Sequence, residues 1–516
     1  MTAVDLEARH ELLCFRRAFP RTAAELRRTL NELERFEARA RRFRDQLANT
    51  GIAGTTYRYP FNHTMTRWLC ESYGKAVEVD WPAYQRHTWD EIAAMLSLCV
   101  VWAENEGLDD DDVPSWDWVD RAKAGDRRTD LAWLLDALRA RGFPPPLERH
   151  LFESLSLPVR WDLTGCRDSI THARLSVRRV FHHQKLLRDR PADFAAEARK
   201  PIGELEALAP ARADRIIHAA RAALSQRERE FHVIVHANRD EVYRVDAGRG
   251  LEIYVIGLAR PERLTLESDF GALLVKNGAP LGYGYAVLLG DRADIAINIF
   301  PTYRAGESPY VFSRFTSLFH HHFGARKFIM RRYQLGHENP EGIEAGSFWF
   351  YHKLGFRSID ATVRAAADAE AVRLARRAGA RSDAPTLRRL ARSDMLITSD
   401  GTPVDAFRDI EVKRVGLAVT QLIERRYGGD RTRALRDIAR RVARVLGTAR
   451  VPERLAPVAA LIPGLERWAP AERRGLLALL RAKEGKRERP FVFALQRHTR
   501  FMRFLNRRFR PPTANG

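Results

Sequence analysis

The chain has 516 residues, of which 45% are hydrophobic and 30% are charged, so it is long enough for two to four domains and can bury a sizeable core. This composition excludes an intrinsically disordered chain. Lys and Arg number 87 against 66 Asp and Glu, which gives a net charge of +21. Such a charge favours polyanionic partners, nucleic acid or tRNA among them. The excess of arginine over lysine is also typical of a bacterial chain from a GC-rich genome.

The cysteines and the N-terminus favour a cytoplasmic location. The four cysteines lie between positions 14 and 166 without CxxC spacing, which fits a reducing compartment and no structural zinc. The first residues, MTAVDLEARHELL, lack the positive region and apolar run of a signal peptide. The longest nearly apolar run, at 93–103, is too short for a bilayer, so we expect no membrane span.

Residues 1–225 predict a mostly helical N-terminal domain. Apolar residues recur with heptad-like spacing at 23–47, which predicts one long amphipathic helix. The stretch 49–84 is rich in Gly, Tyr, Pro and His and predicts a loop over helices. The run Asp109–Asp112 predicts an exposed acidic turn rather than a calcium loop, because the glycine that such a loop requires is missing.

The character of the sequence changes near position 230. The segments FHVIVHA, EVYRV and LEIYVIGLA are short and rich in β-branched residues, which predicts strands. Two turn signals, Asn277-Gly278 and Gly290-Asp291, then divide three apolar runs, which predicts an antiparallel meander. Its strands are expected at about 270–276, 281–289 and 293–300.

The order of elements after the meander is helix, strand, helix and strand. Gly324 is expected to end the first helix, KFIMRRYQL is expected to be a strand, and Gly355 is expected to end a helix over GIEAGSFWFYHKL. A last short strand is expected near RSID, and arginine-rich helices then follow to the end, the last over FVFALQRHTRFMRFLNRRF. The predicted fold class is α+β, with a central mixed sheet and its helices at 226–362 between mostly helical domains at 1–225 and 363–516.

The join between the meander and the following helix, INIFPTYRAGESPYVF, is the first candidate site. A strand-to-helix turn of this kind leaves backbone N–H groups unpaired and aims them at one point, with the helix dipole behind them, which suits a phosphate. Gly306 permits close approach of the backbone, and Arg304 adds a positive charge. Tight turns with Gly and Ser are common, so this signal is weak when taken alone.

Together with FYHKLGF at 350–356, this turn resembles the GCN5-related N-acetyltransferase superfamily over about residues 265–360. The family's pyrophosphate loop reads Arg/Gln-x-x-Gly-x-Gly/Ala between its fourth strand and third helix. Here the segment from Tyr303 to Ser308 keeps the central Gly306, with tyrosine at the first place and serine at the last. The family's later motif is an asparagine after the fifth strand and a helix that ends in Phe/Leu-Tyr-x-Lys-x-Gly-Phe. Asn339 stands farther upstream than usual.

The resemblance implies an acyl-CoA-dependent N-acyltransferase, with acetyl-CoA or another acyl-CoA as co-substrate and no metal. The pantetheine arm would enter between the splayed fourth and fifth strands, and an amine would attack the thioester carbonyl directly. By position, Tyr351 would protonate the leaving thiolate. The residues implied in CoA binding are Ile297, Asn298, Ile299, Phe300, Arg304, Ala305, Gly306, Glu307, Ser308 and Asn339.

Several alternatives stay open. Glu307, His337 and Glu338 are all candidates for the base that deprotonates the amine, and an aromatic stripe such as 348–351 is also typical of a core, where Tyr351 would be structural. The run His320–His322 is no metal site, since successive helix residues point about 100° apart.

The net charge of +21 also supports a different class of function. The protein could keep the fold as a non-catalytic or nucleic-acid-binding scaffold, or take its acyl group from aminoacyl-tRNA.

Overall fold

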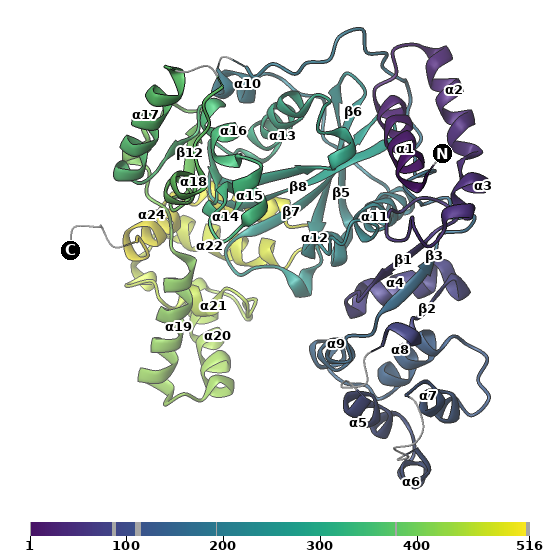
Figure 1. Ribbon diagram of the computed structural model, residues 1–516. Helices are drawn as coiled ribbons and strands as arrows, with labels where there is room; N and C mark the ends of the chain where they lie inside the picture. The colour runs from purple at the N-terminus through teal and green to yellow at the C-terminus, as the bar shows by residue number, and fades with distance from the viewer. Residues whose placement is uncertain (1, 85–88, 109–114, 192, 377–378, 512–516) are drawn as a thin grey trace. The chain divides into compact units, whose positions relative to one another are not determined.

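The computed structural model describes the chain except for residues 1, 85–88, 109–114, 192, 377–378 and 512–516 (Figure 1). The predicted acidic turn at Asp109–Asp112 lies outside the described residues. The structure is mixed α and β with a large mixed sheet, which confirms the predicted class. In the part of the chain that is described, no helix is long and apolar enough to cross a bilayer.

The chain divides into two compact units. The first comprises Met1–Gln184, Arg215–His236 and Lys276–Pro280. The second comprises Lys185–Asp214, Ala237–Val275 and Leu281–Gly516.

The first unit is mostly helical, as predicted, but it also holds a small sheet. Strands β1 (Thr56–Tyr59), β2 (Val77–Val79) and β3 (Val159–Asp162) form an antiparallel sheet in the order β1-β3-β2. Two of these strands and helix α4 (His63–Tyr73) occupy the stretch that the sequence predicts as a loop. These strands are hard to predict from the sequence because β1 and β2 pair with β3, which lies about 80 to 100 residues later in the chain.

The helices of the first unit pack on a core that includes Trp118, Leu134 and Trp161. The predicted long helix at 23–47 is wrong, because the chain breaks at Arg35. FHVIVHA, predicted as a strand, contains a short helix. The remaining helices are α1 (Ala3–Ala18), α2 (Ala23–Glu34), α3 (Phe36–Ala40), α5 (Trp89–Cys99), α6 (Asn105–Leu108), α7 (Ser115–Lys123), α8 (Asp130–Ala140), α9 (Pro145–Ser154) and α12 (His232–Val235), while α11 (Pro210–Ser225) carries residues of both units.

Nine strands, most of whose residues belong to the second unit, form one mixed sheet in the order β11-β12-β10-β9-β8-β7-β6-β5-β4. Their bounds are β4 (Glu206–Ala207), β5 (Ala237–Gly248), β6 (Leu251–Leu258), β7 (Ser268–Lys276), β8 (Ala279–Leu289), β9 (Arg292–Ile299), β10 (Lys327–Met330), β11 (Arg357–Ser358) and β12 (Met395–Thr398). The predicted meander is therefore confirmed as β7, β8 and β9. β9 and β10 pair in parallel, whereas β10 with β12 and β8 with β9 pair antiparallel.

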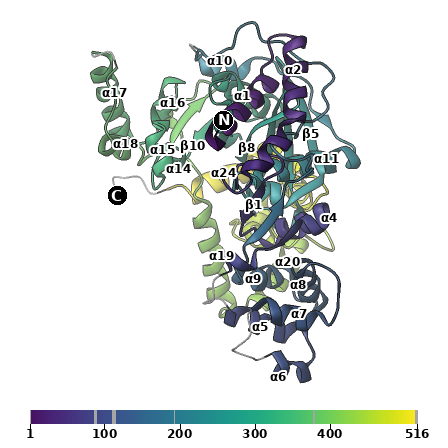
Figure 2. The same cartoon turned by 45° about the vertical axis from the view of Figure 1, so that its right-hand side comes forward.

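Helix α13 (Ser308–Phe323) packs on the sheet and ends at Gly324 in the left-handed conformation, as predicted (Figures 1 and 2). Its buried face includes Val311, Phe312 and Phe315. Close packing requires a glycine in β8, because a Cβ at Gly284 would lie 3.0 Å from the Phe315 ring.

The chain after β10 is more broken than the sequence indicates. The predicted strand KFIMRRYQL ends at Met330, and helix α14 (Arg332–Leu335) follows. The predicted helix over GIEAGSFWFYHKL consists of two, α15 (Pro340–Glu344) and α16 (Ser347–Lys353), separated by Gly346 at a φ of 62°.

The C-terminal region is helical and arginine-rich, as predicted, except for β12, which inserts between β10 and β11. The predicted last helix is broken at His498. The remaining helices of the second unit are α10 (Phe194–Arg199), α17 (Ala361–Ala375), α18 (Ala384–Leu390), α19 (Val412–Tyr427), α20 (Arg431–Leu446), α21 (Ala456–Ala459), α22 (Pro470–Lys483), α23 (Arg489–Arg497) and α24 (Thr499–Arg508). A second core that includes Trp468, Phe491 and Phe501 lies among α19 to α24.

Candidate functional site

The first feature of the candidate site is the place where the parallel pair β9–β10 ends. The register runs from Arg292 opposite Lys327 to Asp294 opposite Ile329. β9 continues to Ile299, whereas β10 ends at Met330 and is followed by α14. The last part of β9 keeps its antiparallel pairing with β8. Its other edge, toward β10, thus extends beyond the last parallel pair, Asp294 opposite Ile329, at Ile297 to Ile299.

The turn after β9 folds on itself and then starts α13. The amides of Tyr303, Arg304 and Gly306 donate to carbonyls of Phe300, Pro301 and Tyr303 at 2.9 to 3.2 Å. The sequence-based expectation that this turn leaves several amides unpaired is therefore wrong for these three groups. Among the described residues, the backbone amides of Ala305 and Ser308 make no hydrogen bond. An anion at the start of α13 would find those two donors and the positive end of the helix.

Two side chains of this turn, Arg304 and Ser308, differ in how firmly they are held in place. The Arg304 side chain is 53% exposed, donates from Nε to the carbonyl of Ile299 at 3.2 Å, and lies 3.6 Å from the Glu341 carboxylate. It can therefore turn toward an anion at the cost of this one hydrogen bond and the exposed contact with Glu341. The Ser308 hydroxyl donates to the carbonyl of Arg304 at 3.2 Å and closes the turn.

Glu307 is a structural anchor. Its carboxylate is fully buried and accepts hydrogen bonds from the Arg249 guanidinium, at 2.6 and 3.1 Å, and from the Leu187 amide at 3.0 Å. A carboxylate held by a cation and a backbone amide has little tendency to take a proton from an amine. The prediction of Glu307 as a base candidate is therefore not supported by its surroundings.

Tyr351 lies in α16 within a cluster of aromatic rings. Its ring centroid is 5.7 Å from Phe312 of α13 and 5.9 Å from Phe356. Among the described residues, its hydroxyl makes no hydrogen bond. Burial, and to a smaller degree the neighbouring Tyr285, raise the pKa of Tyr351 above its usual value. The phenol is therefore neutral at physiological pH and can donate a proton. Helix α13 connects the two parts of the site, since the turn lies at its start and Phe312 contacts Tyr351.

The stretch between β10 and α16 places its polar residues at the surface. The Glu338 side chain is 83% exposed and lies 3.8 Å from the half-buried His337. Asn339 caps α15, since its side chain accepts from the Gly342 amide at 3.3 Å and donates to the carbonyl of Tyr333 at 3.0 Å. Asn339 therefore has a local structural role, and the CoA contact implied for it stays a prediction.

Sequence reasoning missed a network of charges where the β9–β10 pair ends. Asp294 accepts from the Arg331 guanidinium at 2.7 Å and lies 3.2 Å from Arg292. Arg331 also pairs with Asp394 at 2.7 Å and Asp409 at 3.1 Å. Two partners of Arg331 lie more than 60 residues away along the chain, so no local pattern predicts this network.

Tyr285 of β8 lies between this network and Tyr351. Burial and the nearby Asp294 carboxylate raise the pKa of Tyr285 to about 12, and its side chain is hydrogen-bonded with Gln334. In the alternation of β8, Tyr285 lies with Tyr283 and Val287 on the half-buried face, opposite the buried Gly284 and Ala286.

The aromatic cluster is covered by a segment of the same unit. Phe194 of α10 stacks on Phe312 with ring centroids 5.1 Å apart and lies 5.9 Å from Phe356. The Arg190 guanidinium lies over the Phe350 ring at 5.4 Å. Tyr351, which lies in the same cluster, is only 7% exposed.

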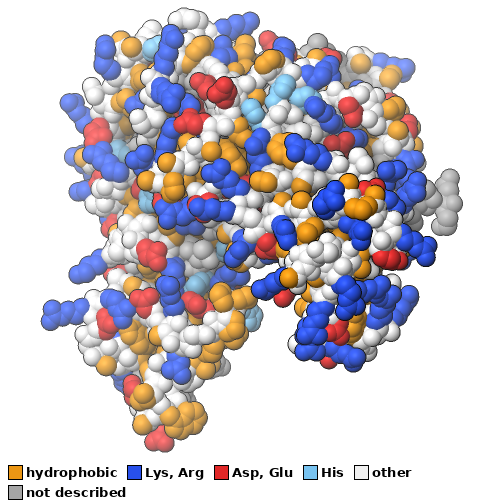
Figure 3. Space-filling view, turned by 180° about the vertical axis from the view of Figure 1, so that it is seen from behind, with side chains coloured by type: hydrophobic (Ala, Val, Ile, Leu, Met, Phe, Trp, Pro, Cys, Tyr) orange, Lys and Arg blue, Asp and Glu red, His pale blue; other side chains and the backbone are white. Residues whose placement is uncertain are grey.

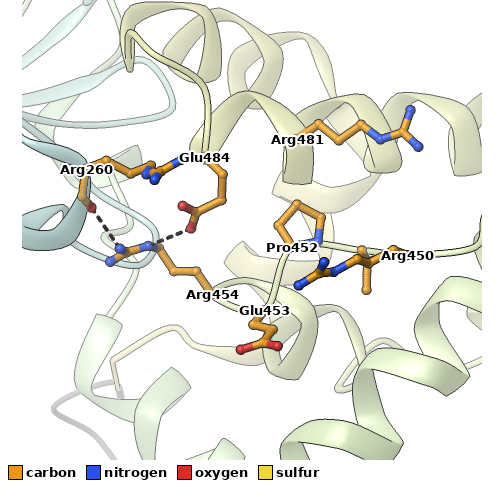
Figure 4. A pocket seen from close by; sticks show the side chains of 8 residues that line it. Arg260, Arg450, Pro452, Glu453, Arg454, Arg481 and Glu484 are labelled. Carbon is orange, nitrogen blue, oxygen red and sulfur yellow. Dashed lines mark hydrogen bonds and ion pairs between the residues drawn. The ribbon is translucent and has the colours of Figure 1, made fainter.

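A pocket of about 730 Å³ lies elsewhere in the second unit (Figure 4). Arg454 spans it, donating to Glu484 at 2.9 Å and to the carbonyl of Arg260 at 2.9 Å. None of the residues lining it belongs to β9, β10 or α16, so this pocket is not part of the candidate site.

Comparison with protein-family models, with curated proteins and with solved structures finds no match. Among the described residues, no group of three or more His, Cys, Asp or Glu side chains is arranged to hold a metal ion.

Proposed function

We propose that the second unit is an acyl-CoA-dependent N-acyltransferase of the GCN5-related type, most simply an N-acetyltransferase. The observation that carries the proposal is the end of the parallel pairing between β9 and β10 at Asp294, with Tyr351 on α16, the third helix after β10. In this proposal β9 and β10 take the places of the family's fourth and fifth strands. A divergence of the two strands beyond Asp294 would admit the pantetheine arm along Ile297 to Ile299.

The turn and the start of α13 would receive the CoA pyrophosphate. The amides of Ala305 and Ser308, the helix dipole and the exposed Arg304 all favour a negative charge there. The buried Glu307 does not oppose this, because its charge is balanced by Arg249.

The reaction would transfer the acyl group in one addition and elimination. The amine nitrogen attacks the thioester carbonyl and forms the new C–N bond, and the C–S bond then breaks. The thiolate takes its proton from the Tyr351 hydroxyl, whose raised pKa keeps it protonated until that moment. The proton lost by the amine goes to a base or to water, and His337 and Glu338 stay the predicted candidates for that role.

Isothermal titration calorimetry with acetyl-CoA and with CoA tests binding. We expect saturable heat with both ligands, and no heat at millimolar ligand would refute the proposal. Tyr351→Phe is then expected to lower turnover at least tenfold with little change in acetyl-CoA affinity, since it removes only the proton donor. Tyr333→Phe is a matched control, because Tyr333 is 56% exposed and the change should leave turnover unaltered.

One observation favours a second candidate, a scaffold that keeps the fold without catalysis. Phe194 and Arg190 cover part of the aromatic cluster, and Tyr351 within it is only 7% exposed. An acyltransferase must move this segment to admit its substrates, whereas a scaffold need not. The calorimetric experiment separates the two, because only the enzyme binds acyl-CoA.

A further inference from the structure

The hairpin of α19 and α20 carries an unusually dense positive charge. Residues 412–446 contain ten Lys and Arg against three Asp and Glu, a net charge of +7 in 35 residues. Seen from behind, Lys and Arg side chains gather over these helices at the lower right (Figure 3). The hairpin thus carries a third of the net charge of the whole chain.

Four arginines form one line on the exposed side of α20. Arg433, Arg436, Arg440 and Arg444 follow one another at helical spacing and are all exposed; we call them the arginine row. At a rise of 1.5 Å per residue, the row is about 16 Å long. Helix α20 is held by its opposite side, where Ala434, Ile438, Val442 and Leu446 are buried in the C-terminal core. The row is therefore displayed on a rigid support.

The charges of the row are poorly balanced within the protein. Arg433, Arg436 and Arg440 share a single carboxylate, Asp437, at 3.7 to 3.8 Å, and their side chains are 58 to 70% exposed. Arg331, which directly follows β10, by contrast has three carboxylate partners of its own. An arginine-rich composition alone explains many arginines, but it does not explain why three of these four share a single carboxylate.

We propose that the arginine row of α20 binds the phosphate backbone of a duplex nucleic acid. A rigid line of guanidinium groups matches the regular line of phosphates, which are the groups that arginine binds best. Residues 431–446 include no aromatic side chain, so this face offers no platform for the stacked bases of a single strand. The contacts are to phosphate alone, and binding is independent of sequence.

A membrane surface fits the same helix less well. An interfacial helix inserts its apolar face among the lipids, but the apolar face of α20 is already buried in the protein core. Only the charged face is available. This proposal does not depend on the acyltransferase function, since it uses other residues.

The test measures fluorescence anisotropy of a labelled mixed-sequence DNA duplex of about 24 base pairs over about 50 to 200 mM salt. The full-length protein is compared with a variant in which all four arginines of the row are changed to glutamine, a residue that preserves helix propensity. If each arginine neutralises one phosphate, the slope of log K against log salt becomes shallower by about 3 to 4 in the variant. The matched control changes Arg376, Arg388, Arg389 and Arg392 to glutamine, which are exposed arginines of the same unit and lower the net charge equally.

The control variant is expected to retain most of the wild-type slope. Equal loss in both variants would show that binding follows net charge and would overturn the proposal, as would no binding of the wild type at the lowest salt. Binding to vesicles containing phosphatidylserine without binding to the duplex would overturn it in favour of a membrane. If the four-site variant melts below the wild type, the pairs Arg433→Gln/Arg436→Gln and Arg440→Gln/Arg444→Gln are measured instead, each with about half the change in slope.

Discussion

At the scale of single residues, the candidate site shows how burial divides side chains that look alike in sequence. Glu307 and Glu338 are both glutamates just before a helix, α13 and α15 respectively. The first is fully buried and held by Arg249, whereas the second is 83% exposed. Buried carboxylates are retained only with partners, and exposed ones change little when replaced. The two residues therefore have different energetic roles.

Glu307→Gln is expected to lower the free energy of unfolding by about 2 to 4 kcal/mol, because it leaves the half-buried Arg249 without its counter-charge and weakens the contact with the Leu187 amide. Urea denaturation followed by circular dichroism measures this. Glu338→Gln is the matched control and is expected to change stability by less than about 0.5 kcal/mol. Equal effects of the two changes would contradict the assignment of Glu307 as an anchor.

At the scale of elements, the sequence predicts those helices and strands whose ends are marked by residues close to them in the chain. The meander and α13 were predicted correctly, because Asn-Gly, Gly-Asp and Gly324 mark turns and a helix end within a few residues. β12 was missed because four residues, MLIT, become a strand only by pairing with β10 and β11 from distant parts of the chain. Likewise, Tyr351 could be proposed from its motif, whereas the network around Asp294 is assembled by tertiary structure alone.

The contact between β8 and α13 provides a prediction at this scale. Gly284→Ala adds a Cβ that would lie 2.9 Å from the carbonyl oxygen of Ala296 and 3.0 Å from the Phe315 ring, so the helix must move from the sheet. We expect a loss of about 1 to 3 kcal/mol in the free energy of unfolding. Gly416→Ala in α19 has the opposite expected sign, a gain of up to about 1 kcal/mol, because nothing lies within 4 Å of the new Cβ and alanine favours a helix. Chemical denaturation of both variants measures whether the first loses and the second gains free energy of unfolding.

At the scale of the whole molecule, the C-terminal helices are joined to the sheet of the second unit by buried charges. Arg263, before β7, donates to the carbonyls of Lys483 and Gly485 at the end of α22, at 2.8 and 2.7 Å. Glu241 of β5 accepts from the amides of Glu488 and Arg489 at 2.7 Å. The sequence could not predict this connection, because its partners are more than 200 residues apart. The basic helices and the sheet thus share one compact unit.

The free energy of unfolding is expected to depend on pH through Asp269 of β7, which lies beside this connection. Burial raises the pKa of Asp269 to about 7, with Glu488 and Glu267 adding to the effect, so the folded state binds its proton more tightly than the unfolded state does. A raised pKa in the folded state contributes stability that is complete below the unfolded pKa of 3.8 and is lost as the pH rises through about 7. Asparagine resembles the protonated acid but cannot ionise. The Asp269→Asn variant should therefore gain stability relative to the wild type between about pH 4 and pH 7, by up to about 1.4 kcal/mol for each unit of pH, and the difference should level off above about pH 7. Urea denaturation of both proteins at several pH values measures the difference, and a difference that stays constant across this range would show that Asp269 ionises in the folded protein as it does in water.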